Sequence, residues 1–335
     1  MKDVAQALVA SGKGILAADE SSGTIKKRFD TIGLESSEEN HRQYRQLLFT
    51  TPLIENFISG VILFDETIRQ KTDNGMPFPK YLADRGIIPG IKVDKGTVEL
   101  EKFSGEKITE GLDGLRDRLA EYGKLGAKFS KWRAVITIGD NIPSDVCVGL
   151  NVEFLARFAA LSQEAGLVPI VEPEVLMDGS HSIAKSEEVN FKVIKNLFVE
   201  LTEHKVDLHS MLLKPSFVHP GKESKEKSSS AEIAQRTLAV LQKCVPMEVP
   251  GIVFLSGGDG PQESTDHLNE INKLGKASWE ISFSFGRALQ EPVLTAWAGK
   301  SENLKAAQEV FYKRAKLNSL ARFGKYSTDL ESKNA

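Results

Sequence analysis

Short apolar runs of strand length recur along the chain, and each one ends in polar residues or glycine. Near-continuous apolar segments of this length are typical of parallel strands whose two faces are both covered. We therefore predict eight buried parallel strands. They lie at residues 15–21, 61–67, 91–95, 129–136, 169–175, 211–217, 252–258 and 281–287.

Helical patterns lie between most of these runs. Ser36 and Glu39 match a capping box ahead of a helically spaced apolar set, and Ser229 and Glu232 repeat the match. Residues 60–90 are rich in turn residues and give no clear pattern. Further amphipathic helices are predicted at residues 112–125, 152–165, 189–201 and 304–320.

Eight strands alternating with helices over 335 residues predict an α/β fold, a (β/α)8 TIM barrel. We expect one domain over residues 1–335, with a short C-terminal tail at about 327–335. The alternative is a doubly wound open sheet, which usually has fewer strands and often a glycine-rich first turn. Residues 19–23, after the first run, read Asp-Glu-Ser-Ser-Gly and lack that fingerprint, which favours the barrel.

Charge and composition exclude several classes of protein. Lys and Arg number 43 against 46 Asp and Glu, so the net charge of −3 gives no positive field for nucleic acid or anionic lipid. No apolar run approaches the roughly 18 residues of a membrane span, and residues 1–11 do not resemble a secretory signal. Two cysteines, Cys147 and Cys244, are too few for a disulfide scaffold. We expect a cytoplasmic protein without nucleic-acid or membrane partners.

Charged side chains interrupt the apolar runs near their C-terminal ends. Because strand side chains alternate faces, Lys131 shares a face with Arg133, and Glu172 shares one with Glu174. The outer face of a barrel strand lies under helices, so we expect these charges to point inward, where barrel active sites lie. Removing a charge from water costs several kcal/mol, which an acid–base site would account for. Asp19, Lys92, Asp94, Lys214 and Ser256 also interrupt apolar neighbours.

The residue types favour amine chemistry over metal or serine chemistry. A catalytic metal would need His and carboxylate ligands at the strand ends, and none of the six His lies in the eight runs. We therefore predict no metal and no cofactor, although carboxylates alone could still hold Mg²⁺. The G-x-S-x-G elbow of a serine nucleophile is absent from the sequence. Lysines at the ends of three strands remain.

A lysine attacks a carbonyl only as the neutral amine, and its ordinary pKa is about 10.4. Burial and a neighbouring cation both lower that pKa. Lys214 lies between Leu213 and Pro215, which makes it the lysine we expect to be most desolvated. Lys131 could supply the neighbouring charge, and Glu172, on the run between them, could transfer protons.

Two polar turns containing glycine follow the seventh and eighth runs. Glycine permits close backbone approach, and an arginine offers a planar fork for phosphate oxygens. Barrels often bind phosphate at these two loops. We therefore predict a phosphate site made of Ser256, Gly257, Gly258, Ser284, Gly286 and Arg287.

Ten stretches between residue 12 and about residue 326 together resemble the class I, Schiff-base-forming fructose-bisphosphate aldolases. The resemblance implies reversible cleavage of fructose 1,6-bisphosphate to dihydroxyacetone phosphate and glyceraldehyde 3-phosphate in glycolysis or gluconeogenesis, by a metal-independent homotetramer. The stretches are GKGILAADES, YRQLLFT, GVILFDET, GIKVDKG, KWR, VPIVEPE, LLKP, FLSGG, GRALQ and ENLKAAQE.

By this resemblance Lys214 corresponds to the Schiff-base lysine and Glu172 to the principal acid/base. Asp19 and Lys131 match residues that assist carbinolamine formation and carbon–carbon cleavage. Glu174 and Arg133 match residues that tune charge and hold substrate.

The resemblance also divides the phosphate contacts between two sites. Ser21, Thr24 and Lys92 fall where the family holds the second phosphate, with Thr24 in place of a frequent Ser. The phosphate of the ketone half is assigned to Ser256, Gly257, Ser284, Gly286 and Arg287.

The resemblance departs at the C-terminus. Many members end in a Tyr on a mobile tail, which assists proton exchange on the enamine. This sequence ends Ser332-Lys333-Asn334-Ala335, and we do not transfer that role to Tyr326. We therefore make no prediction of bisphosphate over monophosphate preference.

Two rival interpretations stay open at this stage. One is a metal-assisted aldolase or another barrel acting on phosphosugars. The other is a scaffold or binding protein that retains the aldolase fold without turnover.

Overall fold

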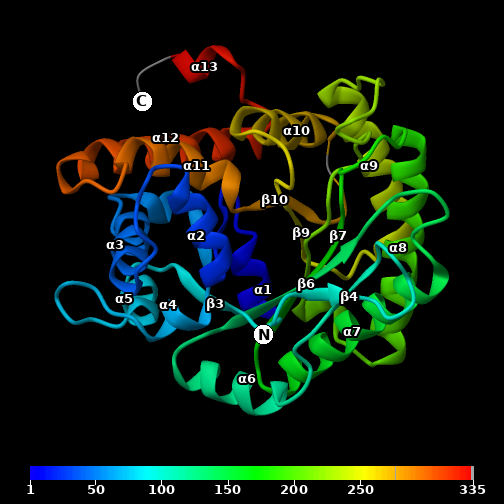
Figure 1. Cartoon of the computed structure of the whole chain (residues 1–335), viewed down its shortest axis with the longest axis horizontal. Helices are drawn as coiled ribbons and strands as arrows, with labels where there is room; N and C mark the ends of the chain where they lie inside the picture. Colours follow the sequence, from blue (N-terminus) through cyan, green and yellow to red (C-terminus); the bar gives the residue numbers. More distant parts are fainter. Residues whose placement is uncertain (276, 333–335) are drawn as a thin grey trace.

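A computed structural model describes residues 1–275 and 277–332 of the chain. Its centre is a closed barrel of parallel strands (Figure 1), which confirms the predicted TIM barrel. Each of the eight predicted runs overlaps one barrel strand. In order around the barrel these strands are β1 (Gly14–Ala18), β2 (Ile58–Leu63), β3 (Ile88–Lys92), β6 (Phe129–Ile136), β7 (Val168–Val175), β8 (Leu212–Leu213), β9 (Gly251–Phe254) and β10 (Glu280–Phe285).

Helices surround this barrel, with α2 to α5 on one side, α7 and α8 on the opposite side, and α10 to α12 along a third side (Figure 1). Among the described residues, none of the helices combines the length and hydropathy needed to cross a bilayer. The helices are α1 (Lys2–Leu8), α2 (Ser22–Asp30), α3 (Glu38–Phe49), α4 (Asp65–Arg69), α5 (Phe78–Asp84), α6 (Leu115–Lys124), α7 (Asp145–Glu164), α8 (Ile183–Glu203), α9 (Ser230–Cys244), α10 (Pro261–Lys273), α11 (Arg287–Trp297), α12 (Leu304–Ala321) and α13 (Asp329–Ser332).

The helix N-termini differ in part from the sequence prediction. Ser229 caps α9 as predicted, because its hydroxyl accepts a hydrogen bond from the Glu232 amide at 3.2 Å. At α3 the predicted cap is wrong by one residue: Ser37 caps the helix, while the Ser36 hydroxyl is engaged by the His41 ring at 2.8 Å.

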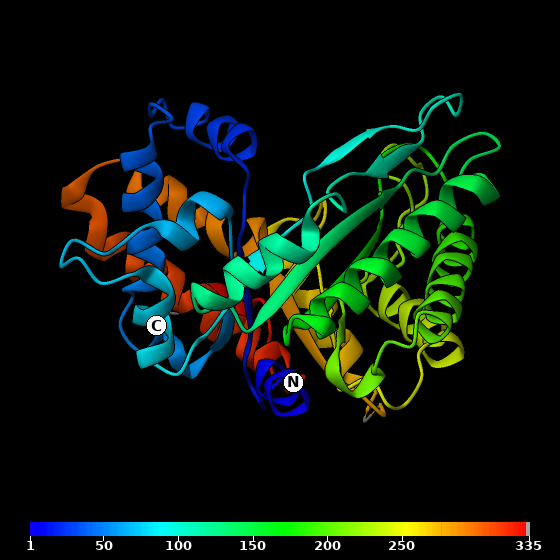
Figure 2. The ribbon, with the colours of Figure 1, turned by 90° about the horizontal axis from the view of Figure 1, so that it is seen from below.

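A two-stranded hairpin, β4 (Thr97–Glu99) and β5 (Lys107–Thr109), was not predicted from the sequence. It projects at the edge of the molecule (Figure 2), and its strands are too short and polar to stand out as apolar runs. The Thr109 hydroxyl donates to the carbonyl of Arg133 at 2.8 Å, so the hairpin is attached to β6 beside two of the candidate site residues.

The end of the barrel next to α1 is filled with apolar side chains. Leu8 of α1 and Phe129 of β6 are fully buried in one cluster with residues from the barrel interior. A Cβ atom at Gly90 would lie 2.3 Å from the Phe129 ring, and one at Gly60 would lie 2.6 Å from Leu8, so these strand glycines make the packing possible. The polar side chains of the strands therefore gather at the opposite end.

Part of the predicted C-terminal tail is ordered against the body of the protein. Residues 329–332 form α13, where the carboxylate of Glu331 pairs with Arg314 of α12 and accepts a hydrogen bond from the Tyr326 hydroxyl at 2.9 Å. The last three residues of that prediction, 333–335, lie outside the described residues.

Candidate active site

A cavity of about 580 Å³ opens at the carboxyl ends of the barrel strands. It is lined by every candidate site residue predicted from the sequence except Gly258. The inward orientation expected for the strand charges explains this convergence, because residues two apart on β6 and on β7 face the same side of the sheet.

Four charged side chains form a continuous chain of ion pairs at the bottom of the cavity. The Lys131 ammonium lies 2.6 Å from Asp19 and 3.1 Å from one oxygen of Glu172. The other Glu172 oxygen lies 3.1 Å from the Lys214 ammonium. The side chains of Lys131, Glu172 and Lys214 are at most 5% exposed, so solvent screens this chain little.

The electrostatics favour a carboxylate at Glu172. Burial raises its pKa, but Lys131 and then Lys214 lower it further, and the net direction is below the ordinary value. The pKa of Asp19 moves the same way, since the same two lysines outweigh its burial. For Lys131 burial lowers the pKa, yet Asp19 and Glu172 raise it above its usual range. Lys131 therefore remains a cation between two carboxylates.

Further ion pairs surround these four charged side chains. The Arg133 guanidinium pairs with the Glu174 carboxylate, two residues further along β6 and β7. Lys92, at the end of β3, lies 2.6 Å from Asp94 and donates to the Asp94 carbonyl at 2.9 Å. These pairs place two cations at the cavity wall where an anionic substrate could contact them.

The predicted phosphate site forms at the N-terminus of α11. Gly286 occupies the N-cap position, and Arg287, the first helical residue, donates to the Gly257 carbonyl. Gly257 has a φ of 53°, in the left-handed region that favours glycine. The buried Ser284 hydroxyl has no hydrogen-bond partner within the part of the chain that the structure describes. Backbone N–H groups and a guanidinium at a helix N-terminus are suited to bind a phosphate.

The other predicted phosphate contacts lie at the N-terminus of α2. Ser21 is the N-cap residue, and its hydroxyl lies 3.1 Å from that of Thr24. Both residues line the cavity together with Lys92, which comes from the neighbouring part of the barrel mouth. Two helix N-termini therefore face one cavity, together with the cations of Lys92, Arg133 and Arg287.

Comparison with known proteins identifies the family to which this chain belongs. The family model of class-I fructose-bisphosphate aldolase matches residues 1–335. A probable class 1 fructose-bisphosphate aldolase of Xylella fastidiosa is 56% identical over 97% of this chain and 98% of its own length. The cytosolic fructose-bisphosphate aldolase 4 of Arabidopsis thaliana is 52% identical over 96% of this chain and 82% of its own.

A solved structure agrees. Fructose-bisphosphate aldolase from Plasmodium falciparum, crystallised with TRAP and a small-molecule inhibitor, superposes with a TM-score of 0.96 at 49% identity, covering 97% of this chain and 94% of that one. The chain belongs to the class I fructose-bisphosphate aldolase family.

Several residues of this class I aldolase cavity were missed by the sequence analysis. Lys27 and Arg28 of α2 line the cavity and add two cations beside Ser21. The basic run at residues 26–28, directly after the first strand, was a signal that could have been used. Glu20 also lines the cavity, paired with Arg28 and with the buried Arg45 at 2.6 Å.

Gly258 is the one residue of the predicted phosphate site that does not line the active-site cavity. It lines a smaller neighbouring cavity instead of the active-site cavity. A Cβ atom there would lie 2.3 Å from the Lys222 ammonium and 2.7 Å from the Met177 sulfur, so this glycine makes room for a covering loop. Ser256 and Gly257, the first two residues of this turn, line both cavities.

Proposed function

We propose that this chain catalyses the reversible aldol cleavage of fructose 1,6-bisphosphate to dihydroxyacetone phosphate and glyceraldehyde 3-phosphate through a Schiff base on Lys214. Family membership supports the reaction. The observation that carries the residue assignment is the buried Lys214 amine, 3.1 Å from a carboxylate that is itself paired with a second lysine.

Imine formation needs a neutral amine and a proton carrier. Glu172 accepts a proton from Lys214, whose nitrogen then bonds to the ketone carbon to form a carbinolamine. Glu172 returns a proton to the carbinolamine hydroxyl, which leaves as water and gives the iminium. The Lys131 cation lies 3.1 Å from the other Glu172 oxygen and favours the carboxylate form that accepts this proton.

Cleavage then uses the iminium as an electron acceptor. Asp19 takes the proton of the hydroxyl on the carbon that becomes the aldehyde, the carbon–carbon bond breaks, and its electron pair forms an enamine. Protonation of the enamine carbon and addition of water release dihydroxyacetone phosphate and restore the amine. No metal is required in these steps, because the protonated nitrogen accepts the electrons.

The two phosphate groups orient the substrate across the barrel mouth. The site at the N-terminus of α11 holds the phosphate of the ketone half, and Ser21, Thr24 and Lys92 hold the other. Arg133, paired with Glu174, lines the same cavity. Fixing both ends places the ketone carbon at Lys214, which is the geometric requirement for rapid attack.

Trapping with borohydride tests the proposal. Reduction in the presence of dihydroxyacetone phosphate should fix the three-carbon unit on Lys214, located by peptide mass mapping. Lys214→Met should lose both the adduct and all but a trace of cleavage, because only the nucleophile is removed. The matched control, Lys225→Met on the exposed loop before α9, should retain both.

A peptide map without an adduct, or full cleavage by Lys214→Met, would overturn the assignment. Cleavage lost in EDTA and restored by zinc, without any trapped adduct, would instead favour a metal-assisted aldolase. An intact adduct without cleavage of the hexose bisphosphate would favour a binding protein.

We further propose a cytoplasmic homotetramer. Relatives with cytosolic names in Arabidopsis thaliana and a cytoplasmic isozyme in Spinacia oleracea, 52% identical to this chain, support the location. The tetramer rests on the family resemblance, and light scattering of the purified chain measures it directly.

A further inference from the structure

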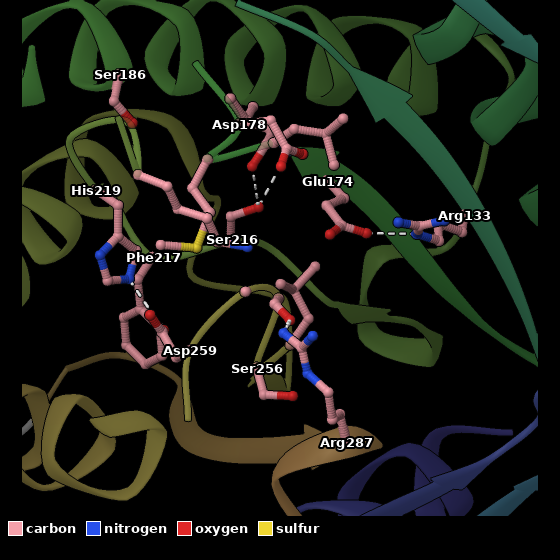
Figure 3. A pocket seen from close by; sticks show the side chains of 17 residues that line it. Arg133, Glu174, Asp178, Ser186, Ser216, Phe217, His219, Ser256, Asp259 and Arg287 are labelled. Carbon is pink, nitrogen blue, oxygen red and sulfur yellow. Dashed lines mark hydrogen bonds and ion pairs between the residues drawn. The ribbon is translucent and has the colours of Figure 1, made fainter. Parts of the chain in front are cut away.

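A second cavity, of about 190 Å³, adjoins the active-site cavity behind the turn that carries Ser256 (Figure 3). The proposed reaction makes no use of the side chains at its far wall. There His219, in the loop between β8 and α9, points toward Asp259, which follows β9 (Figure 3). His267 of α10 lies against both.

These three side chains form a compact cluster. His219 Nε2 lies 3.1 Å and His267 Nε2 lies 3.9 Å from the same Asp259 oxygen, Oδ2. The two imidazole rings are 4.9 Å apart between centroids. One ligand atom from each residue lies within 4.8 Å of the other two. The segments that contribute them are up to 48 residues apart in the sequence, so the fold creates the cluster.

Burial makes this cluster unlike a surface group of charges. The three residues are 6–7% exposed, and Phe217 packs against both imidazole rings. His219 Nε2 is buried and makes no hydrogen bond among the described residues, although Asp259 Oδ2 lies 3.1 Å away. An imidazole nitrogen left unpaired in such a site costs free energy unless something binds it.

The donor set and its spacing suit a transition-metal ion. Two neutral imidazole nitrogens and one carboxylate oxygen are ligands that zinc and its neighbours prefer, with bonds of about 2.0–2.2 Å. Ligand atoms in a tetrahedral zinc site are therefore about 3.3 Å apart. The observed 3.1 Å and 3.9 Å lie on either side of this separation, and all three ligand atoms lie within 4.8 Å of one another.

We propose that His219, Asp259 and His267 bind one divalent transition-metal ion of the zinc class, with a fourth position open to the smaller cavity. The ion plays no part in the aldol chemistry. It links three segments: the loop after β8, the turn after β9 and helix α10.

The consequence for the active site is positional. The Asp259 amide donates to the Ser256 carbonyl at 3.0 Å, which closes the turn whose first two residues face the phosphate site. A metal on Asp259 would therefore hold that turn to α10. We expect metal binding to raise the thermal stability of the protein and to lower the KM for phosphorylated substrate, while kcat changes little.

Metal titration of the full chain tests the site without relying on activity. Protein stripped with EDTA and dialysed is titrated with Co²⁺, followed by its visible absorption, and the Co²⁺ is then displaced with Zn²⁺. We expect one equivalent per chain. His219→Asn and His267→Asn should each weaken Zn²⁺ binding by more than about 100-fold, since even partners one shell further out are worth 10- to 100-fold.

His209→Asn is the matched control, because His209 is an exposed histidine on the 3₁₀ turn before β8. It should bind Co²⁺ like the parent chain. If His219→Asn does not fold by circular dichroism, Asp259→Asn provides the second test of the same site. Absence of stoichiometric binding to the parent, or equal binding by the parent and both cluster variants, would overturn the proposal. Borohydride trapping on stripped protein reports separately on Lys214, so the two proposals can fail independently.

Discussion

At the scale of single residues, the position of Glu172 between two buried lysines is the decisive feature. Each of its oxygens faces one ammonium at 3.1 Å. The carboxylate therefore offsets two cations that could not otherwise be buried together. It is also the group best placed to carry protons to and from Lys214, since the structure puts it within direct reach.

Glu172→Gln tests both consequences. We expect cleavage to fall by about 10²–10⁴-fold, the usual contribution of a positioned acid/base, because the amide neither accepts nor returns a proton. Borohydride trapping should become slow, and the acid limb of the pH–rate profile should change shape. Glu223→Gln, an exposed carboxylate on the loop before α9, is the control. An unchanged pH profile in Glu172→Gln would assign the proton transfer to another group.

At the scale of elements, the barrel strands were predictable and the shorter pieces were not. Parallel strands covered on both faces must be apolar nearly throughout, so each of them left a run in the sequence. Even β8, with only Leu212 and Leu213 in the ladder, was found, because the apolar run extends beyond the paired residues. The β4–β5 hairpin lies at the surface and its residues alternate too briefly to be recognised.

The site residues followed the same division. Those on strands were found because a charge interrupts an apolar run, as at Lys131. Lys27 and Arg28 of α2 were missed because a charge on an amphipathic helix usually faces solvent. Only the fold shows that the N-terminal end of α2 faces the cavity.

The caps supply a prediction at this scale. Ser229→Ala should lower the free energy of unfolding by about 1 kcal/mol, because the Glu232 amide loses the acceptor that caps α9. Ser230→Ala, one residue into the helix, is the matched control and should be neutral or slightly stabilising, since alanine has the higher helix propensity. Urea unfolding followed by circular dichroism measures both. Equal stability of the two variants would argue against a role for the cap.

At the scale of the whole molecule, one buried cluster joins the two ends of the chain. Glu20, directly after β1, pairs with Arg45 of α3 at 2.6 Å and accepts a hydrogen bond from the Gln290 amide of α11 at 2.8 Å. Arg45 also donates to the Gln290 side chain at 3.1 Å. Since β1 pairs with β10 to close the barrel, this cluster reinforces the closure. Residues about 245 positions apart leave no local pattern, so the sequence could not reveal it.

Glu20→Gln should therefore destabilise the protein by about 3–5 kcal/mol, because the 2% exposed Arg45 side chain loses its counter-charge. Burial raises the pKa of Glu20, but Arg45 and Arg28 lower it more, and the net direction is downward. A carboxyl group whose pKa is lower in the folded state stabilises that state at pH values above its unfolded pKa of about 4.3. This contribution is lost as the pH falls.

The difference in free energy of unfolding between the parent and Glu20→Gln should thus be largest near pH 7 and shrink as the pH falls below about 4. Urea unfolding across this range measures it. Asp30→Asn, which breaks an ion pair with Lys26 whose side chains are more than half exposed, is the control and should cost less than about 1 kcal/mol. A difference that stays constant with pH would show that the charge of Glu20 is not responsible.

The apolar side chains that fill the end of the barrel next to α1 affect how substrate enters and products leave. Because Leu8 and Phe129 fill the opposite end of the barrel, substrate enters and products leave through the mouth of the active-site cavity. In the proposed mechanism, after the carbon–carbon bond breaks, one fragment is still bound to Lys214 through nitrogen while the other is free. The untethered aldehyde must therefore leave first in the forward direction, and in the reverse direction it must arrive last.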